Sequence, residues 1–150
     1  MIRKICDSTK HTDPLKAIMW TLREGEPMTG IERIEAERQR QINDKGWTPE
    51  HDDEHPLGEL SQAAACYADI AGALMHGAKV GDIKDYYCDC TGPNPQWPFE
   101  DAAWKPSQDP VRNLAKAGAL IAAEIDRLSR QNAIAMAAAD ERTPSKETTL

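Results

Sequence analysis

Apolar residues recur at helical spacing in three segments of this chain, and each segment is expected to form a helix. The three predicted helices cover residues 29–45, 58–76 and 109–139. Thr29 and Glu32 have the spacing of a capping box at the start of the first helix, and Gly46 is a residue type that commonly ends one. In the last helix, four large aliphatic residues lie on one face: Leu114, Ile121, Ile125 and Leu128.

Polar residues fall on or beside the apolar stripe of the first predicted helix. They are Glu35, Arg38 and Gln41. A polar side chain on an inward face needs a hydrogen-bonding partner if it is buried. We therefore expect this helix to line a site as well as a core.

The segments between and around the helices define the domain organisation. Residues 1–28 are expected to be irregular apart from one short helix, residues 29–139 to form a single α-helical domain, and residues 140–150 to be a flexible polar tail. Residues 78–108 combine four prolines with two tryptophans and a phenylalanine, which predicts a long ordered loop without helix. The predicted fold class is all-α, a bundle of about four helices with this long Trp/Pro-rich loop.

Composition narrows the class of protein. Of the 150 residues, 40% are hydrophobic and 5% aromatic, which favours closely packed helices over a β-sandwich. The net charge of −7 disfavours extended nucleic acid as a partner, because phosphate neutralisation needs clustered lysine and arginine. No apolar run reaches the roughly 20 residues that span a bilayer, and no signal peptide is recognisable, so a cytoplasmic protein without a membrane partner is expected. Cys88 and Cys90 are expected to be free thiols.

The connector between the first two predicted helices, residues 46–59, has the densest charge in the chain. It contains five adjacent residues that can ligate a metal or bind a polar ligand: His51, Asp52, Asp53, Glu54 and His55. Carboxylates suit Mg²⁺ or Mn²⁺, and imidazole suits Zn²⁺ or Fe²⁺. A hydrated acidic turn that caps the following helix is the alternative, and the sequence leaves both open.

A magnesium site would need further carboxylates from the helices. The set we consider is Glu35, Asp53, Glu59 and Glu124. Glu32 and Glu35 form an E-x-x-E pattern that resembles the first half of the Mg²⁺-binding motif of MazG-like helical nucleotide pyrophosphohydrolases. The second half of that motif is E-x-x-D, whereas Glu124 and Asp126 are two residues apart and cannot share one helical face. The resemblance is partial, and it implies Mg²⁺ as a cofactor.

Aromatic and basic residues suggest a different site. Trp47, Trp97 and Trp104 can stack on a planar ring, and Trp47 and Trp104 are the two expected to contact a ligand. Four cations can bind phosphate: Arg38, Lys105, Arg112 and Lys116. Alternatively, the tryptophans close one end of the bundle and the cations pair with the many carboxylates.

Several motifs together resemble a widespread family of small uncharacterised phage and prophage proteins, over roughly residues 31–130. The matching pieces are Glu37–Gln41, Gly46–His55, Gly58–Leu60, Ala63–Ala68, Trp97–Phe99, Trp104–Pro106 and Asn113–Leu128. The resemblance implies a phage accessory protein in the cytoplasm of the host cell. Such proteins commonly act on nucleotide pools or counter host defence.

Three functions follow from these patterns. The first is a protein that binds a nucleotide or nucleotide-derived signal between the acidic connector and the Trp-rich loop, without a cofactor, and sequesters it from host defence. The second is a Mg²⁺-dependent pyrophosphohydrolase, and the third is an acidic inhibitor of a host protein. A homodimer or higher homo-oligomer would help so small a domain to build a site.

Overall fold

The computed structural model describes residues 27–83 and 97–142, and these residues form an all-α fold, as predicted. The α-helices are α2 (Gly30–Lys45), α3 (Pro49–Asp53), α4 (Glu59–Met75), α5 (Val80–Ile83) and α6 (Pro110–Asp140), with one turn of 3-10 helix, η2 (Asp101–Ala103). The short helix predicted within residues 1–28, both cysteines of the CxC pair and most of the polar tail lie outside the described residues.

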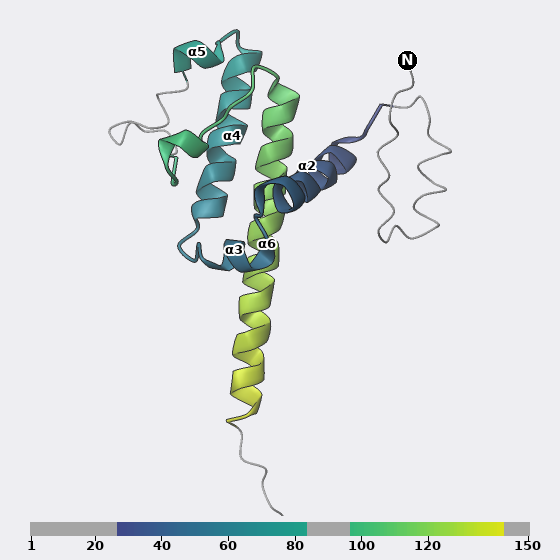
Figure 1. Ribbon diagram of the computed structural model, residues 1–150, viewed down its shortest axis with the longest axis vertical. Helices are drawn as coiled ribbons and strands as arrows, with labels where there is room; N and C mark the ends of the chain where they lie inside the picture. The colour runs from purple at the N-terminus through teal and green to yellow at the C-terminus, as the bar shows by residue number, and fades with distance from the viewer. Residues whose placement is uncertain (1–26, 84–96, 143–150) are drawn as a thin grey trace, which may run out of the picture.

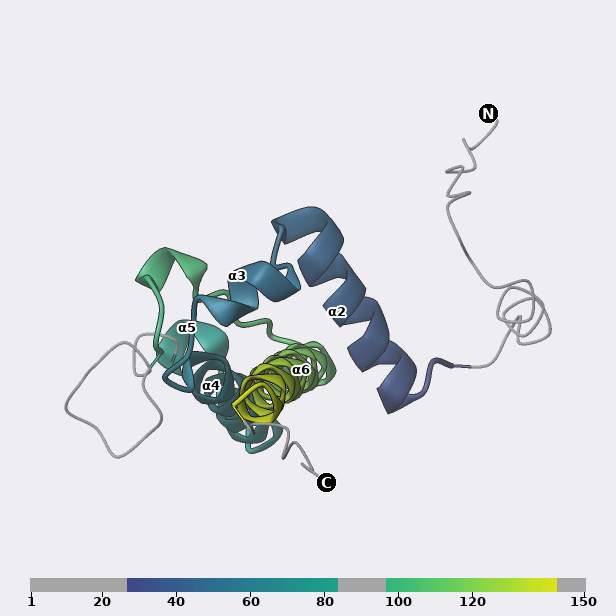
Figure 2. The ribbon, with the colours of Figure 1, turned by 90° about the horizontal axis from the view of Figure 1, so that it is seen from below.

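The core lies between α4 and α6, which run antiparallel side by side (Figure 1). Small residues dominate the contact, including Ala63 and Ala71 of α4 and Ala119 and Ala123 of α6, all 0% exposed. Helix α2 crosses α6, and α3 lies between α2 and α4 when the molecule is seen from below (Figure 2). The connector between α2 and α4 therefore lies on one side of the α4–α6 pair.

The predicted ends of α2 are confirmed. The Thr29 hydroxyl accepts a hydrogen bond from the Glu32 amide, and the Glu32 carboxylate accepts one from the Thr29 amide at 2.7 Å. Gly46 adopts a left-handed conformation with φ 71°. The Trp47 amide then donates to the Gln41 carbonyl at 3.1 Å, which turns Trp47 back over the end of the helix.

The connector of residues 46–59 contains a short helix in its first half. Pro49 is the first residue of α3, and Thr48 caps this helix by accepting from the His51 amide at 3.4 Å. Proline suits this position because the first turn of a helix leaves its N–H groups unbonded in any case. The prediction that residues 78–108 contain no helix was wrong at α5 and η2.

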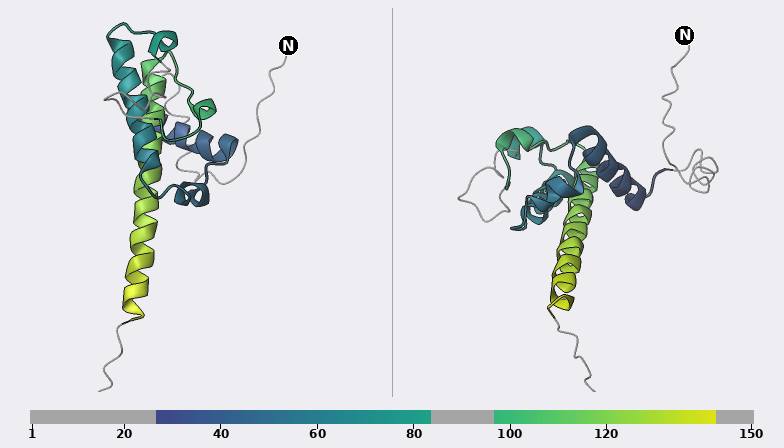
Figure 3. Two further views of the ribbon diagram at one scale, coloured as in Figure 1. Left: turned by 90° about the vertical axis from the view of Figure 1, so that its left-hand side faces the viewer. Right: turned by 60° about the horizontal axis from the view of Figure 1, so that its bottom comes forward.

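The large aliphatic row of α6 faces away from the core. Leu114 is 45% exposed and Ile125 is 58% exposed, whereas the buried face consists of alanines, Leu120 and four polar residues: Asn113, Lys116, Glu124 and Arg127. Beyond residue 130, the whole of α6 is exposed, and it extends past the other helices (Figure 3). No helix of the described segments is long and apolar enough to cross a membrane.

The described end of the Trp-rich loop packs on α4. Trp97 and Trp104 are 9% and 8% exposed, with their ring centroids 4.8 Å apart. Both rings contact Tyr67, at centroid distances of 5.6 and 4.8 Å. Burial of these large rings holds residues 97–104 against the bundle and so brings the loop opposite α3.

Candidate functional site

Two pockets adjoin where α2, α3 and the Trp-rich loop meet. We call the first the aromatic pocket. It has a volume of about 510 Å³ and is lined by Arg38, Trp47, His51, Asp52, His55, Leu60, Trp97, Pro98, Phe99, Glu100, Ala103 and Leu120. We call the second the basic pocket. It has a volume of about 530 Å³ and is lined by Glu37, Arg40, Gln41, Lys45, Trp47, Tyr67, Ala102, Ala103, Lys105, Pro106, Ser107, Arg112 and Lys116.

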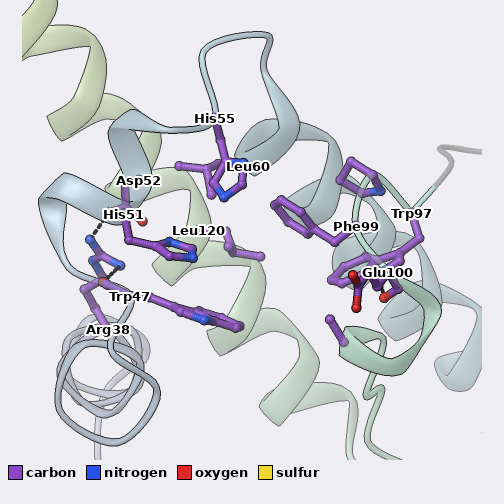
Figure 4. Close-up of a pocket in the computed structure, with 12 residues that line it drawn as sticks. Arg38, Trp47, His51, Asp52, His55, Leu60, Trp97, Phe99, Glu100 and Leu120 are labelled. Atoms are coloured by element: carbon purple, nitrogen blue, oxygen red, sulfur yellow. Dashed lines mark hydrogen bonds and ion pairs between the residues drawn. The ribbon is translucent and has the colours of Figure 1, made fainter.

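Aromatic rings follow one another around the aromatic pocket. The Trp47 and His51 rings are nearly parallel, with centroids 6.4 Å apart, and the centroid of His55 is 5.1 Å from that of His51. His55 then meets Phe99 of the Trp-rich loop at 5.0 Å. Figure 4 shows Trp47 and His51 on one side of the cavity, Phe99 on the other and Leu120 behind them. The pocket can therefore enclose a planar group between ring faces and edges.

The polar atoms of this pocket include a buried ring nitrogen. The Nδ1 atom of His51 is buried and makes no hydrogen bond among the described residues. A buried polar atom without a partner destabilises the protein, by about 1–3 kcal/mol in typical cases, unless a ligand or water satisfies it. His51 Nδ1 can thus contact a polar edge of a bound ring.

Arg38 and Asp52 form the support of the aromatic pocket. The Arg38 guanidinium donates to the Asp52 carboxylate and to the Trp47 carbonyl, the latter at 3.3 Å. Asp52 is only 2% exposed. The ion pair attaches α3 to α2, and Arg38 also holds the backbone of Trp47. Arg38 and Asp52 are therefore engaged with each other in this structure.

The basic pocket has five cations and one carboxylate. The cations are Arg40, Lys45, Lys105, Arg112 and Lys116. The carboxylate, Glu37, pairs with Arg40 at 2.7 Å. Burial raises the pKa of Glu37, but the hydrogen bond from Arg40 and the charges of Arg40 and Lys116 outweigh burial and lower this pKa. Within the described ranges, Lys45, Lys105 and Arg112 form no ion pair.

Lys116 lies at the inner wall of the basic pocket. Its ammonium donates to the Lys105 carbonyl at 2.5 Å and sits 5.0 Å from the centroid of the Tyr67 ring. Burial lowers the pKa of Lys116 to about 8, and the charges of Arg112 and Arg40 act in the same direction, against that of Glu37. A neighbouring anion would therefore stabilise the charged form of Lys116.

A reciprocal pair of hydrogen bonds fixes the loop above Lys116. The Ser107 amide donates to the Asn113 side-chain oxygen at 2.8 Å, and the Asn113 side-chain amide donates to the Ser107 carbonyl at 2.7 Å. Asn113 is completely buried. Because this pair pins the loop to α6, Lys105 and Arg112 are held on the same side of the basic pocket.

Two of the predicted acidic residues, Asp53 and Glu124, are paired with arginines of α6. Asp53 accepts from Arg130 at 2.8 Å, and Glu124 accepts from Arg127 at 2.7 Å. Glu59 accepts from the Leu57 amide at 2.7 Å and so stabilises the turn before α4. Of these contacts, the one between Asp53 and Arg130 attaches the connector to α6.

The four carboxylates predicted to hold Mg²⁺ do not converge. Glu35 is exposed on α2, and Glu124 forms an ion pair inside the bundle. Across the described parts of the chain, no group of three or more His, Cys, Asp or Glu side chains could hold a metal ion. The set of Glu35, Asp53, Glu59 and Glu124 therefore does not fit a magnesium site in this arrangement.

The eleven predicted ligand-binding residues divide into three groups. Five line the aromatic pocket: Arg38, Trp47, His51, Asp52 and His55. Three line the basic pocket: Lys105, Arg112 and Lys116. Three line neither pocket: Asp53, Glu54 and Trp104. Trp104 lies in the core, where the ring contacts Tyr67 and Trp97.

Sequence reasoning missed several residues of both pockets. Nothing in the sequence marked Phe99 and Leu120 as pocket residues, because an apolar residue in a loop or helix is expected to belong to the core. Gln41 could have been found, because it is a polar residue beside the apolar stripe of α2.

Comparisons with known protein families, curated proteins and solved structures give no match for this chain.

Proposed function

We propose that this protein binds a nucleotide or nucleotide-derived signalling molecule and holds it unchanged. The observation that carries the proposal is the run of rings from Trp47 through His51 and His55 to Phe99 around a cavity of about 510 Å³. Cavities of this size commonly take a small molecule, and base–aromatic stacking is worth about 1–3 kcal/mol per base.

The polar groups of the aromatic pocket suit a heterocycle better than a plain hydrocarbon. His51 Nδ1 lacks a hydrogen-bonding partner in the described structure, and Glu100 lines the same cavity. A nucleobase carries ring nitrogens and exocyclic groups that can meet both. A purely apolar ligand would leave His51 Nδ1 unsatisfied.

We favour binding over hydrolysis because several candidate carboxylates are already engaged in ion pairs. Asp52, Asp53 and Glu124 each pair with an arginine, so their charges are already neutralised. A Mg²⁺-dependent pyrophosphohydrolase needs several carboxylates that converge on one ion. The phage origin, the role against host defence and the homo-oligomer rest on sequence patterns and stay predictions.

The test is to incubate the full-length protein with a panel of ribonucleotides and Mg²⁺, and then to denature it and identify what is released by mass spectrometry. We expect an intact nucleotide. Trp47→Ala should weaken its binding about tenfold to a hundredfold, since one stacking partner is lost. Leu57→Ala is the control, because Leu57 is 88% exposed in the same connector and lines neither pocket. Hydrolysed products would overturn the proposal, as would equal binding by both variants.

A further inference from the structure

The basic pocket adjoins the aromatic pocket through two shared residues. Trp47 and Ala103 line both cavities, so the two pockets are neighbours. A ligand whose ring stacks in the aromatic pocket therefore has the basic pocket beside it. The groups that line the basic pocket therefore indicate the class of the ligand.

The basic pocket is poorly neutralised. Lys45, Lys105 and Arg112 form no ion pair in the described structure, and Glu37 is paired with Arg40. In a protein with a net charge of −7, an unpaired group of cations around one cavity is unexpected from composition. Such a group suits an anion, and phosphate above all, because its oxygens accept several charge-assisted hydrogen bonds.

Gln41 adds a second and independent requirement. It is 1% exposed, lines the basic pocket and has no hydrogen-bonding partner for its side-chain oxygen within the described residues. Its amide group is used by a hydrogen bond to Glu37. An oxygen acceptor cannot bind a phosphate oxygen, and it needs a donor such as a hydroxyl group. A sugar hydroxyl next to a phosphate supplies both.

We infer that the basic pocket holds the phosphate and a sugar hydroxyl of the molecule whose ring lies in the aromatic pocket, so that the ligand is a ribonucleotide and not a free base or nucleoside. This inference rests on the proposed function for the ring. Lys105 and Arg112 bind the phosphate from the loop and from α6, Lys116 supports them from the inner wall, and Gln41 accepts from the hydroxyl. Trp47 separates the two halves of the ligand.

The inference is tested by calorimetric titration of the full-length protein with ribonucleoside 5′-monophosphates, the matching nucleosides and the 2′- and 3′-deoxy monophosphates. We expect each preferred monophosphate to bind at least about tenfold more tightly than its nucleoside, as one charge-assisted hydrogen bond would give. At least one deoxy form should bind more weakly than the ribonucleotide. Added salt should weaken binding of the monophosphate and leave that of the nucleoside nearly unchanged.

Arg112→Ala separates the two pockets, with Arg142→Ala as the matched control. Both arginines are exposed, but Arg142 lies just beyond the far end of α6 and lines neither pocket. We expect Arg112→Ala to lose about tenfold in affinity for the monophosphate while nucleoside binding is kept, and Arg142→Ala to change neither.

The outcomes also separate the two proposals. If nucleoside and monophosphate bind equally tightly, the phosphate site is overturned and the proposed function stands. Equal weakening of both ligands by Arg112→Ala would likewise overturn it, because the residue would then be structural. If neither ligand binds, the proposed function fails, and the inference fails with it.

Discussion

The aromatic pocket and the basic pocket are nearly equal in volume and share Trp47 and Ala103, yet they differ in how their charges are used. In the aromatic pocket, the cation Arg38 is engaged by the buried carboxylate of Asp52. In the basic pocket, Lys105 and Arg112 have no such partner among the described residues. Both pockets contain cations, but among the described residues only the basic pocket has cations without an ion-pair partner.

The difference teaches that a charged residue lines a site in one of two roles. A paired charge such as Arg38 or Asp52 positions the backbone and aromatic rings around it, and its removal should act mainly through stability. An unpaired charge at a cavity acts on the ligand, and its removal should act mainly through affinity. The following predictions are ordered by the size of their expected effect.

The largest effect is expected for Asp52→Ala. It leaves the guanidinium of Arg38, which is 12% exposed, without its ion-pair partner. Breaking a buried pair in this way destabilises a protein by about 3–5 kcal/mol. Urea denaturation of the free protein measures the change. Asp53→Ala is the control, because its pair with Arg130 is on the surface and its loss should leave the unfolding midpoint almost unchanged. Similar midpoints for both variants would show that Asp52 is not a structural partner.

A smaller effect is expected from pH, through Lys116. The pKa of this buried lysine is lowered to about 8, so the side chain loses its charge between pH 7 and pH 9. Its neighbours are Glu37, Arg40, Arg112 and Tyr67; burial raises the pKa of the tyrosine to about 12, which keeps it neutral in this range. Affinity for a ribonucleoside monophosphate should therefore fall as pH rises, by up to about tenfold.

Two controls accompany the pH measurement. Lys116→Met should bind the monophosphate weakly with a flat profile between pH 7 and pH 9. Nucleoside binding by the unchanged protein should be flat in the same range, because no phosphate is present. An affinity for the monophosphate that rises with pH would contradict the assigned role of Lys116.

The smallest effect is expected for His51→Phe. The substitution keeps a ring beside Trp47 but removes Nδ1, the buried atom that has no partner in the described structure. Affinity for a nucleoside should fall about two- to tenfold, which is the contribution of one hydrogen bond. The free protein should be as stable as before or more so. His55→Phe serves as the comparison in the same pocket, and an equal loss there would assign the effect to shape instead of to Nδ1.

The sequence by itself determined the helices whose ends have local signals. Thr29 and Glu32 cap α2 through bonds between residues three apart, and Gly46 ends it because a left-handed residue favours glycine. These features depend only on near neighbours in the chain. The sequence also led to the prediction of a site from ring-bearing and basic residues of the connector and the loop.

Only the tertiary structure decided which candidate residues are available to a ligand. Trp47 and Trp104 are the same residue type, but Trp104 is buried against Tyr67, whereas Trp47 lines both pockets. Asp53 is engaged by Arg130, which follows it by 77 residues. Burial and pairing are set by which helix faces meet, and the crossing of α2 and α3 over α6 is a long-range property that local spacing does not specify.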